Sequence, residues 1–269
     1  MDRALVVDSA TRLGSDAADA VVVCGSHGGL YAAWLAAQAG VRAVVFNDAG
    51  VGRHQAGVAG VRWLDALEIP ACAVDYRSAR IGDGADTLAS GVVTMANDLA
   101  AQQGCLPGHT CRQVVDCLLR HSAPASRNDV PAMGEGRARI GNTGHREVWA
   151  LDSAALVEAD DRRKIVVTGS HAGMLGGRQD DGVLAVDVFA ALFNDAGGGK
   201  DDAGYARLAV LDARGIAAAT VSAYSARIGD GRSTYETGVL SRLNEAAKRL
   251  ELKEGMTARE AVARLVGLA

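Results

Sequence analysis

Internal repetition constrains the fold of this chain more than any other feature of its sequence. The string SARIGDG occurs at residues 78–84 and again at residues 225–231. Other strings return in the same order: VVVCGSHGG (21–29) as IVVTGSHAG (165–173), FNDAG (46–50) as FNDAG (193–197), and LPGHTCRQVVDCLL (106–119) as KEGMTAREAVARLV (253–266). The repeated unit is longer than the about 20–45 residues of a solenoid repeat, so we expect a domain-sized duplication with pseudo-twofold symmetry.

The repeats divide the chain into three parts. We expect a first α/β repeat over residues 1–122, a linker over 123–145 and a second α/β repeat over 146–269. The linker is rich in small and polar residues, a composition typical of a surface excursion.

Apolar strand patterns alternate with helical patterns in each half. AVVVCG (20–25), VRAVVF (41–46) and ACAVDY (71–76) are short apolar runs, and ALVVDSATRL (4–13) is compatible with a further, edge strand. LYAAWLAAQAG (30–40) is typical of a helix, and we expect helices over residues 87–103 and 110–120 as well. Continuous apolar strands separated by helices predict a three-layer α/β fold with a mainly parallel sheet in each half.

The repeated motifs follow successive strands. GSHGG follows the first apolar run, NDAG the second and SARIGDG the third, so all three are expected at the carboxyl edge of a parallel sheet, where ligands bind in open α/β folds. A repeat kept only for packing should share mainly apolar residues, whereas these motifs are mostly polar. We therefore expect a functional site at this edge.

Six residues are candidates for catalysis. His27 and His171 suit a general base or a polarising donor, and the Asp of NDAG can orient the histidine. Ser, His and Asp on three neighbouring strand ends could assemble a catalytic relay, although no GxSxG elbow is present, so each Ser could equally be a ligand-binding hydroxyl. The candidates are His27, Asp48 and Ser78 in the first half and His171, Asp195 and Ser225 in the second.

The remaining polar positions are candidates for substrate binding. Repeated positive charges after NDAG and inside SARIGDG favour an anionic or carbonyl-rich ligand. Each also has a structural interpretation: Asn and Asp form turns and helix caps, and an Arg can pair with a nearby Asp. The candidates are Ser26, Asn47, Arg53, Arg80 and Asp83, and their counterparts Ser170, Asn194, Lys200, Arg227 and Asp230.

Composition and motifs argue against several classes of protein. The net charge is −4 with basic and acidic residues interspersed, so nucleic acid is not an expected partner. No GxGxxG, Walker A, HExxH or CxxC pattern occurs, and we expect neither a cofactor nor a metal. The start lacks a signal-peptide pattern, and no segment resembles a membrane span. The odd count of five cysteines suits reduced thiols. These features favour a cytoplasmic protein, and a homo-oligomer is compatible with them.

Three classes of function remain open. The first is a cofactor-independent enzyme acting on a small anionic or carbonyl-containing metabolite, with amide or ester hydrolysis as the leading reaction. The second is an isomerase or lyase that uses the same groups for proton transfer, and the third is a non-catalytic ligand-binding or regulatory module. The halves diverge at residues 176–182, GGRQDDG, where a lid or specificity loop would distinguish one site from the other.

Overall fold

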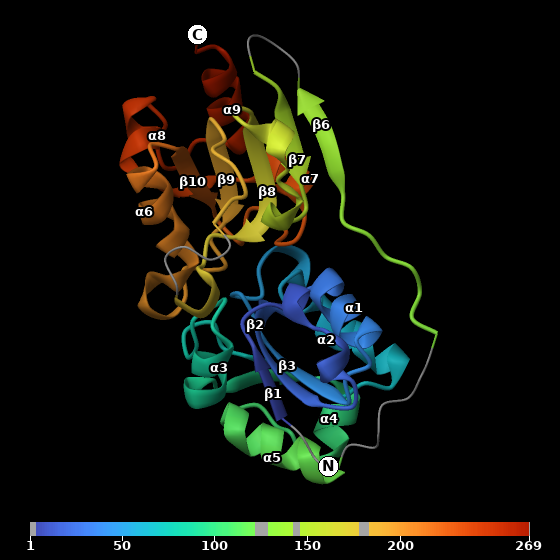
Figure 1. The fold of residues 1–269 in the computed structure, drawn as a ribbon. Coiled ribbons are helices and arrows are strands. Elements are labelled where there is room, and N and C mark those ends of the chain that lie inside the picture. The colour runs from blue at the N-terminus through green and yellow to red at the C-terminus, as the bar shows by residue number, and fades with distance from the viewer. Residues whose placement is uncertain (1–3, 122–128, 142–145, 178–182, 269) are drawn as a thin grey trace.

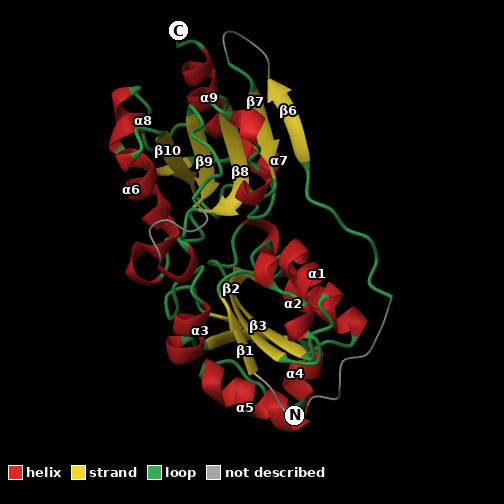
Figure 2. Ribbon diagram, in the orientation of Figure 1, coloured by secondary structure: helices red, strands yellow, loops and turns green. Residues whose placement is uncertain are grey.

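The structure is a computed structural model that describes residues 4–121, 129–141, 146–177 and 183–268. Two β-sheets, each flanked by helices, lie one above the other in Figure 1, and Figure 2 shows the same arrangement by secondary structure. The α/β class with two mainly parallel sheets is therefore confirmed.

The first sheet has the strand order β1-β2-β3-β4-β5. The first four strands are parallel and β5 is antiparallel to β4. The strands are β1 Ala4–Val7, β2 Val21–His27, β3 Ala43–Asn47, β4 Ala71–Val74 and β5 Val93–Ala96. The helices of this half are α1 Leu30–Gln38, α2 Ala59–Trp63, α3 Gly84–Ser90, α4 Asp98–Gln102 and α5 Cys111–His121.

The second sheet has the order β11-β10-β9-β8-β7-β6, in which β7 to β10 are parallel and both outer strands are antiparallel to their neighbours. The strands are β6 Arg137–Gly141, β7 Val148–Leu151, β8 Ile165–His171, β9 Ala190–Asn194, β10 Ala217–Val221 and β11 Leu240–Leu243. The helices are α6 Ala206–Ala213, α7 Gly231–Thr237, α8 Glu245–Arg249 and α9 Ala258–Val266.

Alternating strand residues bury both faces of each sheet. In β2, Val21 and Val23 pack in one cluster with Leu118 of α5, whereas Val22 packs in another with Ala33 of α1. Because successive side chains of a strand point to opposite faces, an unbroken apolar run needs helices on both sides. This requirement produces the three layers that the sequence predicts.

One expectation about local structure is wrong. Residues 87–103 do not form one helix: α3 ends at Ser90, β5 follows, and α4 begins at Asp98. Gly91 and the β-branched residues after it favour an extended chain and interrupt the helical pattern. Within the segment 123–145, residues 137–141 form the edge strand β6, and residues 123–128 and 142–145 lie outside the described residues.

The two sheets meet at the carboxyl ends of their strands. The Arg53 N–H donates to the Ala223 carbonyl at 2.8 Å, and the Lys200 N–H donates to the Tyr76 carbonyl at 2.9 Å. A small apolar cluster at this junction contains Ala49, Ile81, Ala196, Ala203 and Ile228. The repeated motifs of the two halves therefore contact each other.

No helix within the described ranges combines the length and the apolar character needed to cross a bilayer.

Candidate active site between the two sheets

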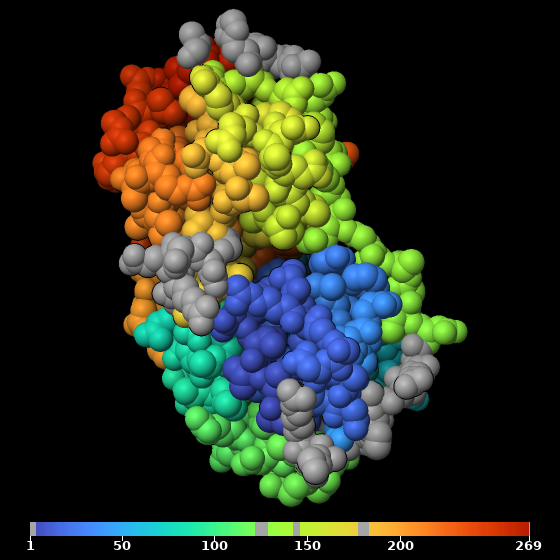
Figure 3. Space-filling model, viewed as in Figure 1, coloured from blue at the N-terminus to red at the C-terminus, as the bar shows by residue number. Residues whose placement is uncertain are grey.

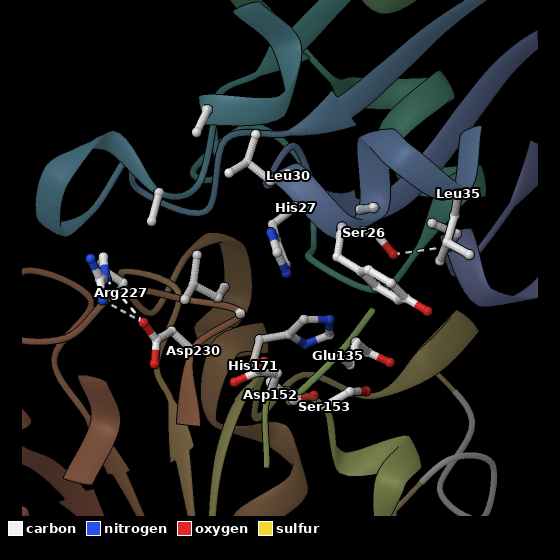
Figure 4. A pocket seen from close by; sticks show the side chains of 18 of the residues that line it. Ser26, His27, Leu30, Leu35, Glu135, Asp152, Ser153, His171, Arg227 and Asp230 are labelled. Carbon is white, nitrogen blue, oxygen red and sulfur yellow. Dashed lines mark hydrogen bonds and ion pairs between the residues drawn. The ribbon is translucent and has the colours of Figure 1, made fainter. Parts of the chain in front are cut away.

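A cavity of about 540 Å³ lies between the two halves. Figure 3 shows the surface hollowed between the blue first half and the yellow second half, and Figure 4 shows the side chains that line the cavity. Polar lining residues come from β2, β8, the loop after β7, the SARIGDG loop of the second half and the linker: Ser26, His27, Glu135, Asp152, Ser153, Ser170, His171, Arg227 and Asp230. Ser9, Thr11, Tyr31 and His54 also line the cavity.

His27 is the last residue of β2 and its imidazole is neutral. Burial lowers its pKa to about 4. The Gly29 N–H donates to Nδ1 at 3.1 Å, which assigns the imidazole proton to Nε2. His27 therefore presents an Nε2–H donor on the side that Figure 4 shows directed into the cavity.

His171 at the end of β8 repeats this geometry. The Gly173 N–H donates to its Nδ1 at 3.1 Å, and the side chain is buried. Burial, followed by the positive charge of Arg207 and the nearby His27, lowers the pKa of His171 well below its ordinary value. Two neutral imidazoles thus direct Nε2–H groups into one cavity.

The glycine two residues after each histidine has no room for a side chain. A Cβ on Gly29 would lie 2.6 Å from Nδ1 of His27, and a Cβ on Gly173 would lie 2.9 Å from Nδ1 of His171. A SARIGDG glycine of the other half also lies beside each imidazole. A Cβ on Gly229 would lie 3.6 Å from Cε1 of His27, and a Cβ on Gly82 would lie 3.4 Å from Cε1 of His171. The repeated glycines thus shape the walls beside both histidines.

Glu135 supplies an ionisable carboxyl group to the same cavity. Burial, and next the negative charge of Asp152, raises its pKa to about 7, while a hydrogen bond with Ser153 opposes the shift. Asp152 is itself held by backbone donors, from Gly136 at 2.5 Å and from Gly231 at 3.1 Å. A carboxyl with a pKa near neutrality can both accept and donate a proton.

The linker that carries Glu135 is attached at both ends to the folded halves. Trp34 Nε1 of α1 donates to the Pro131 carbonyl at 2.8 Å, and the contact of Gly136 with Asp152 fixes the far end. Glu135 has no counterpart in the repeat, so the comparison of halves misses it. The only sequence signal is a single acidic residue between two glycines in an otherwise small and polar segment.

The structure brings six of the predicted site residues to the cavity: Ser26, His27, Ser170, His171, Arg227 and Asp230. The hydroxyl oxygens of the two GSH serines accept backbone N–H groups, from Ala10 at 3.0 Å for Ser26 and from Ala154 at 2.8 Å for Ser170. Arg227 pairs with Asp230, with 2.6 Å between Nη2 and Oδ2. The other ten predicted residues lie outside the cavity lining.

The SARIGDG serines form turns. Ser78 Oγ donates to the Asp75 carbonyl at 2.7 Å and accepts the Val92 N–H at 2.9 Å. Ser225 Oγ makes the same pair of bonds with the Ser222 carbonyl and the Val239 N–H. In the part of the chain that the structure describes, neither serine is hydrogen-bonded to a histidine.

The NDAG side chains also bond to the backbone. Asn47 and Asn194 accept N–H groups two residues further along the chain and donate to the carbonyls of Ala79 and Ala226. Asp48 accepts from Gly50 and Tyr76, and Asp195 accepts from Gly197 and Ala223. These bonds connect neighbouring strand ends. The histidines are oriented by glycine N–H groups instead.

The remaining charged candidates pair across the junction or cap a helix. Arg80 Nη2 lies 2.5 Å from Asp201, and Lys200 Nζ lies 2.7 Å from Asp86. Arg53 Nη1 donates to the Ser225 carbonyl at 3.3 Å. Asp83 caps α3 by accepting the Asp86 N–H.

The divergent loop is only partly described. Gly176 and Gly177 lie in a 3-10 turn, Leu175–Gly177, and the Gly176 N–H donates to the Gly82 carbonyl at 2.7 Å. Residues 178–182, proposed above as part of a lid or specificity loop, lie outside the described residues. Among the residues that are described, no group of three His, Cys, Asp or Glu is arranged to hold a metal ion.

Comparison of the chain with protein-family models, curated proteins and solved structures finds no significant match.

Proposed function

We propose that the protein is an enzyme that transfers a proton on a small carbonyl compound, as an isomerase or lyase. The observation that supports this most strongly is a pair of neutral imidazole N–H donors facing one cavity with a carboxyl group of pKa about 7. In this proposal, the Glu135 carboxylate removes a proton from the carbon next to the substrate carbonyl. The Nε2–H groups of His27 and His171 donate to the oxygen on which negative charge develops.

The neutral state of the histidines suits this role. An imidazole that donates from Nε2 while its Nδ1 accepts a backbone N–H has no free lone pair to act as a base. Its pKa, far below neutrality, keeps the N–H donor present without bringing a positive charge into the cavity. The base is therefore assigned to Glu135 and the polarising donors to the histidines.

Amide or ester hydrolysis through serine has less support. Its nucleophile would be Ser78 or Ser225, and each hydroxyl already donates to a carbonyl and accepts a backbone N–H. Asp48 and Asp195 bond to backbone donors, which suits a structural role. Proton transfer requires no covalent intermediate between enzyme and substrate, and it uses only groups that line the cavity.

We further propose that the two halves arose by duplication of one α/β unit. The repeated motifs and the matching strand orders of β1 to β5 and β7 to β11 support this origin. A single composite site at the junction explains why a duplicated chain would keep both histidines.

Hydrogen exchange tests the proposed reaction directly. The protein is incubated in D₂O with a panel of small 2-oxo acids, hydroxy ketones and aldehydes, and deuterium in recovered substrate is measured by NMR. We expect wild-type exchange above the buffer rate with at least one compound and a decrease of about 10²- to 10⁴-fold in Glu135→Gln, which lacks the base.

Other outcomes of this experiment would contradict the proposal. Exchange that survives unchanged in Glu135→Gln assigns the base to another group. Compounds that bind with no exchange support the ligand-binding module instead. Hydrolysis of esters with an acyl group trapped on Ser78 or Ser225 supports the hydrolase.

A further inference from the structure

Arg207 is a buried arginine whose hydrogen-bonding groups are mostly unpaired. It lies in the first turn of α6 and is 4% exposed. Nη2 donates to the Gly173 carbonyl at 3.2 Å, whereas Nε and Nη1 have no hydrogen-bond partner in the described structure. A buried charge with unpaired donors is unfavourable by itself, so a negatively charged group beside the guanidinium would stabilise the site.

Arg207 lines a second cavity, of about 420 Å³, next to the first. The two cavities share Ser9, Thr11, Ser153, Ser170 and His171. A molecule held at Arg207 would therefore lie beside His171, and a short extension would reach the cavity that contains Glu135.

The charges around this second cavity favour an anion. No Asp or Glu is found among its described lining residues. Its other basic residue, Arg214, is paired with Asp187, with 2.5 Å between Nη2 and Oδ1. Burial lowers the pKa of Arg207 to about 10, so the guanidinium still carries its charge at neutral pH. Its Cζ lies 5.1 Å from the centre of the Phe193 ring, and none of the described acidic side chains forms an ion pair with it.

We propose that Arg207 binds a carboxylate of the substrate, so that the substrate is a carbonyl compound bearing a carboxylate. The inference rests on the proposed function for one point: that the carboxylate and the reacting carbonyl belong to the same molecule. A carboxylate is a favoured partner of a guanidinium, and its single negative charge balances the single positive charge of Arg207. The serine and threonine hydroxyls that line both cavities can bond to the rest of the molecule.

The first half has no such site. The residue of α2 whose N–H donates to the Gly28 carbonyl is Gly60, and the residue of α6 whose N–H donates to the Ala172 carbonyl is Arg207. A Cβ on Gly60 would lie 2.4 Å from the Gly29 carbonyl oxygen and 2.5 Å from the Cβ of Ala33. Close packing of α1 and α2 therefore excludes any side chain at the matched position, and the carboxylate site belongs to the second half alone.

Ligand binding measured without turnover tests the inference. Acetate, a small 2-oxo acid and inorganic phosphate are titrated into wild type, Arg207→Met, Arg207→Lys and the matched control Arg214→Met, with calorimetry and thermal unfolding as readouts. We expect the 2-oxo acid to bind wild type and Arg214→Met alike and to bind Arg207→Met about 10- to 100-fold more weakly. Arg207→Lys keeps the charge and should retain part of the affinity.

Arg207→Met is expected to fold, because it replaces a poorly paired buried charge with an apolar side chain of similar length. Its thermal midpoint without added anion should equal or exceed that of wild type. Equal carboxylate affinity in wild type and Arg207→Met would overturn the inference. So would an equal loss in Arg214→Met, a response to phosphate alone, or no binding of any probe.

The results separate this inference from the proposed reaction. Carboxylate binding that depends on Arg207, with no deuterium exchange in any compound, leaves the site standing and rejects proton transfer. Exchange that is equally fast in wild type and Arg207→Met rejects the carboxylate site and leaves proton transfer standing.

Discussion

The two halves present their histidines in the same way but surround them differently. His27 and His171 each end a central strand and accept a glycine N–H at 3.1 Å. Beside His171 lie Arg207 and a second cavity, whereas at the matched position beside His27, Gly60 allows α1 and α2 to pack closely. The repeated residues therefore hold the two imidazoles alike, and the residues that differ between the halves make the surroundings of the two imidazoles unequal.

Removing one histidine N–H donor at a time tests the difference between the two halves most directly. His27→Asn and His171→Asn each keep an oxygen that can accept the glycine N–H but lose the Nε2–H donor. We expect each to lower the exchange rate about 10²- to 10³-fold, as loss of one oxyanion donor does. Gln reaches the Nε2 position with an N–H group and should retain more activity than Asn.

The deuterium-exchange rates of the two Asn variants and the two Gln variants should be measured on folded protein under the exchange conditions given above. A loss with His171→Asn alone would restrict the reaction to the second half. Full activity in both Asn variants would remove the donors from the mechanism.

Acid stability tests the neutral state of the histidines. Because the folded pKa of His27 is lowered from 6.5 to about 4, its contribution to stability is fully present above pH 6.5 and is lost as the pH falls from 6.5 through 4. The shift corresponds to about 3 kcal/mol. Urea unfolding at pH 7 and pH 4.5 should show that His27→Asn loses about 2–3 kcal/mol less than wild type between these values.

The contribution of Glu135 to stability changes with pH in the opposite direction to that of His27, so Glu135 provides a control for this measurement. Its folded pKa is raised from 4.5 to about 7, so its contribution is fully present below pH 4.5 and is lost as the pH rises through 7. Glu135→Gln should therefore show a larger loss of stability on acidification than wild type. An identical pH dependence in wild type and His27→Asn would show that His27 is not held neutral.

The asymmetry of helix packing can be tested with Gly60→Ala. The new Cβ would lie 2.4 Å from the Gly29 carbonyl oxygen, so the backbone must shift, and we expect a loss of about 1–3 kcal/mol in the free energy of unfolding. The reference for this change is Arg207→Met at the matched position, where we expect no loss. Equal destabilisation by the two changes would mean that α1 and α2 do not restrict the first half in this way.

The serine turns should give the smallest effects and the most symmetric ones. Ser78→Ala and Ser225→Ala each remove a hydroxyl bonded to a backbone carbonyl and a backbone N–H. We expect each to lower the free energy of unfolding by about 1 kcal/mol, with exchange activity unchanged in folded protein. A loss of activity of a hundredfold or more in either stable variant would return serine to the mechanism.

The class of fold, and the sheet edge at which polar residues gather, could be predicted from the amino-acid pattern alone. Unbroken apolar runs such as VVVC and AVVF need helices on both faces, and parallel strands bring their carboxyl ends to one edge, so His27 and His171 could be predicted as site residues. The repeat also indicated that the second half would present a matching set.

Which of those residues line one cavity depends on how the two sheets pack against each other, and the amino-acid pattern does not predict this packing. Contacts between the sheets connect the repeated motifs, and the backbone uses the side chains of Asn47, Asp48 and Ser78 as hydrogen-bonding partners. Strand periodicity does not encode these partners, because they come from turns distant in the sequence. Glu135 and Arg207 could not be found from the repeat, because the pKa of one and the unpaired donors of the other depend on burial by segments far apart in the chain.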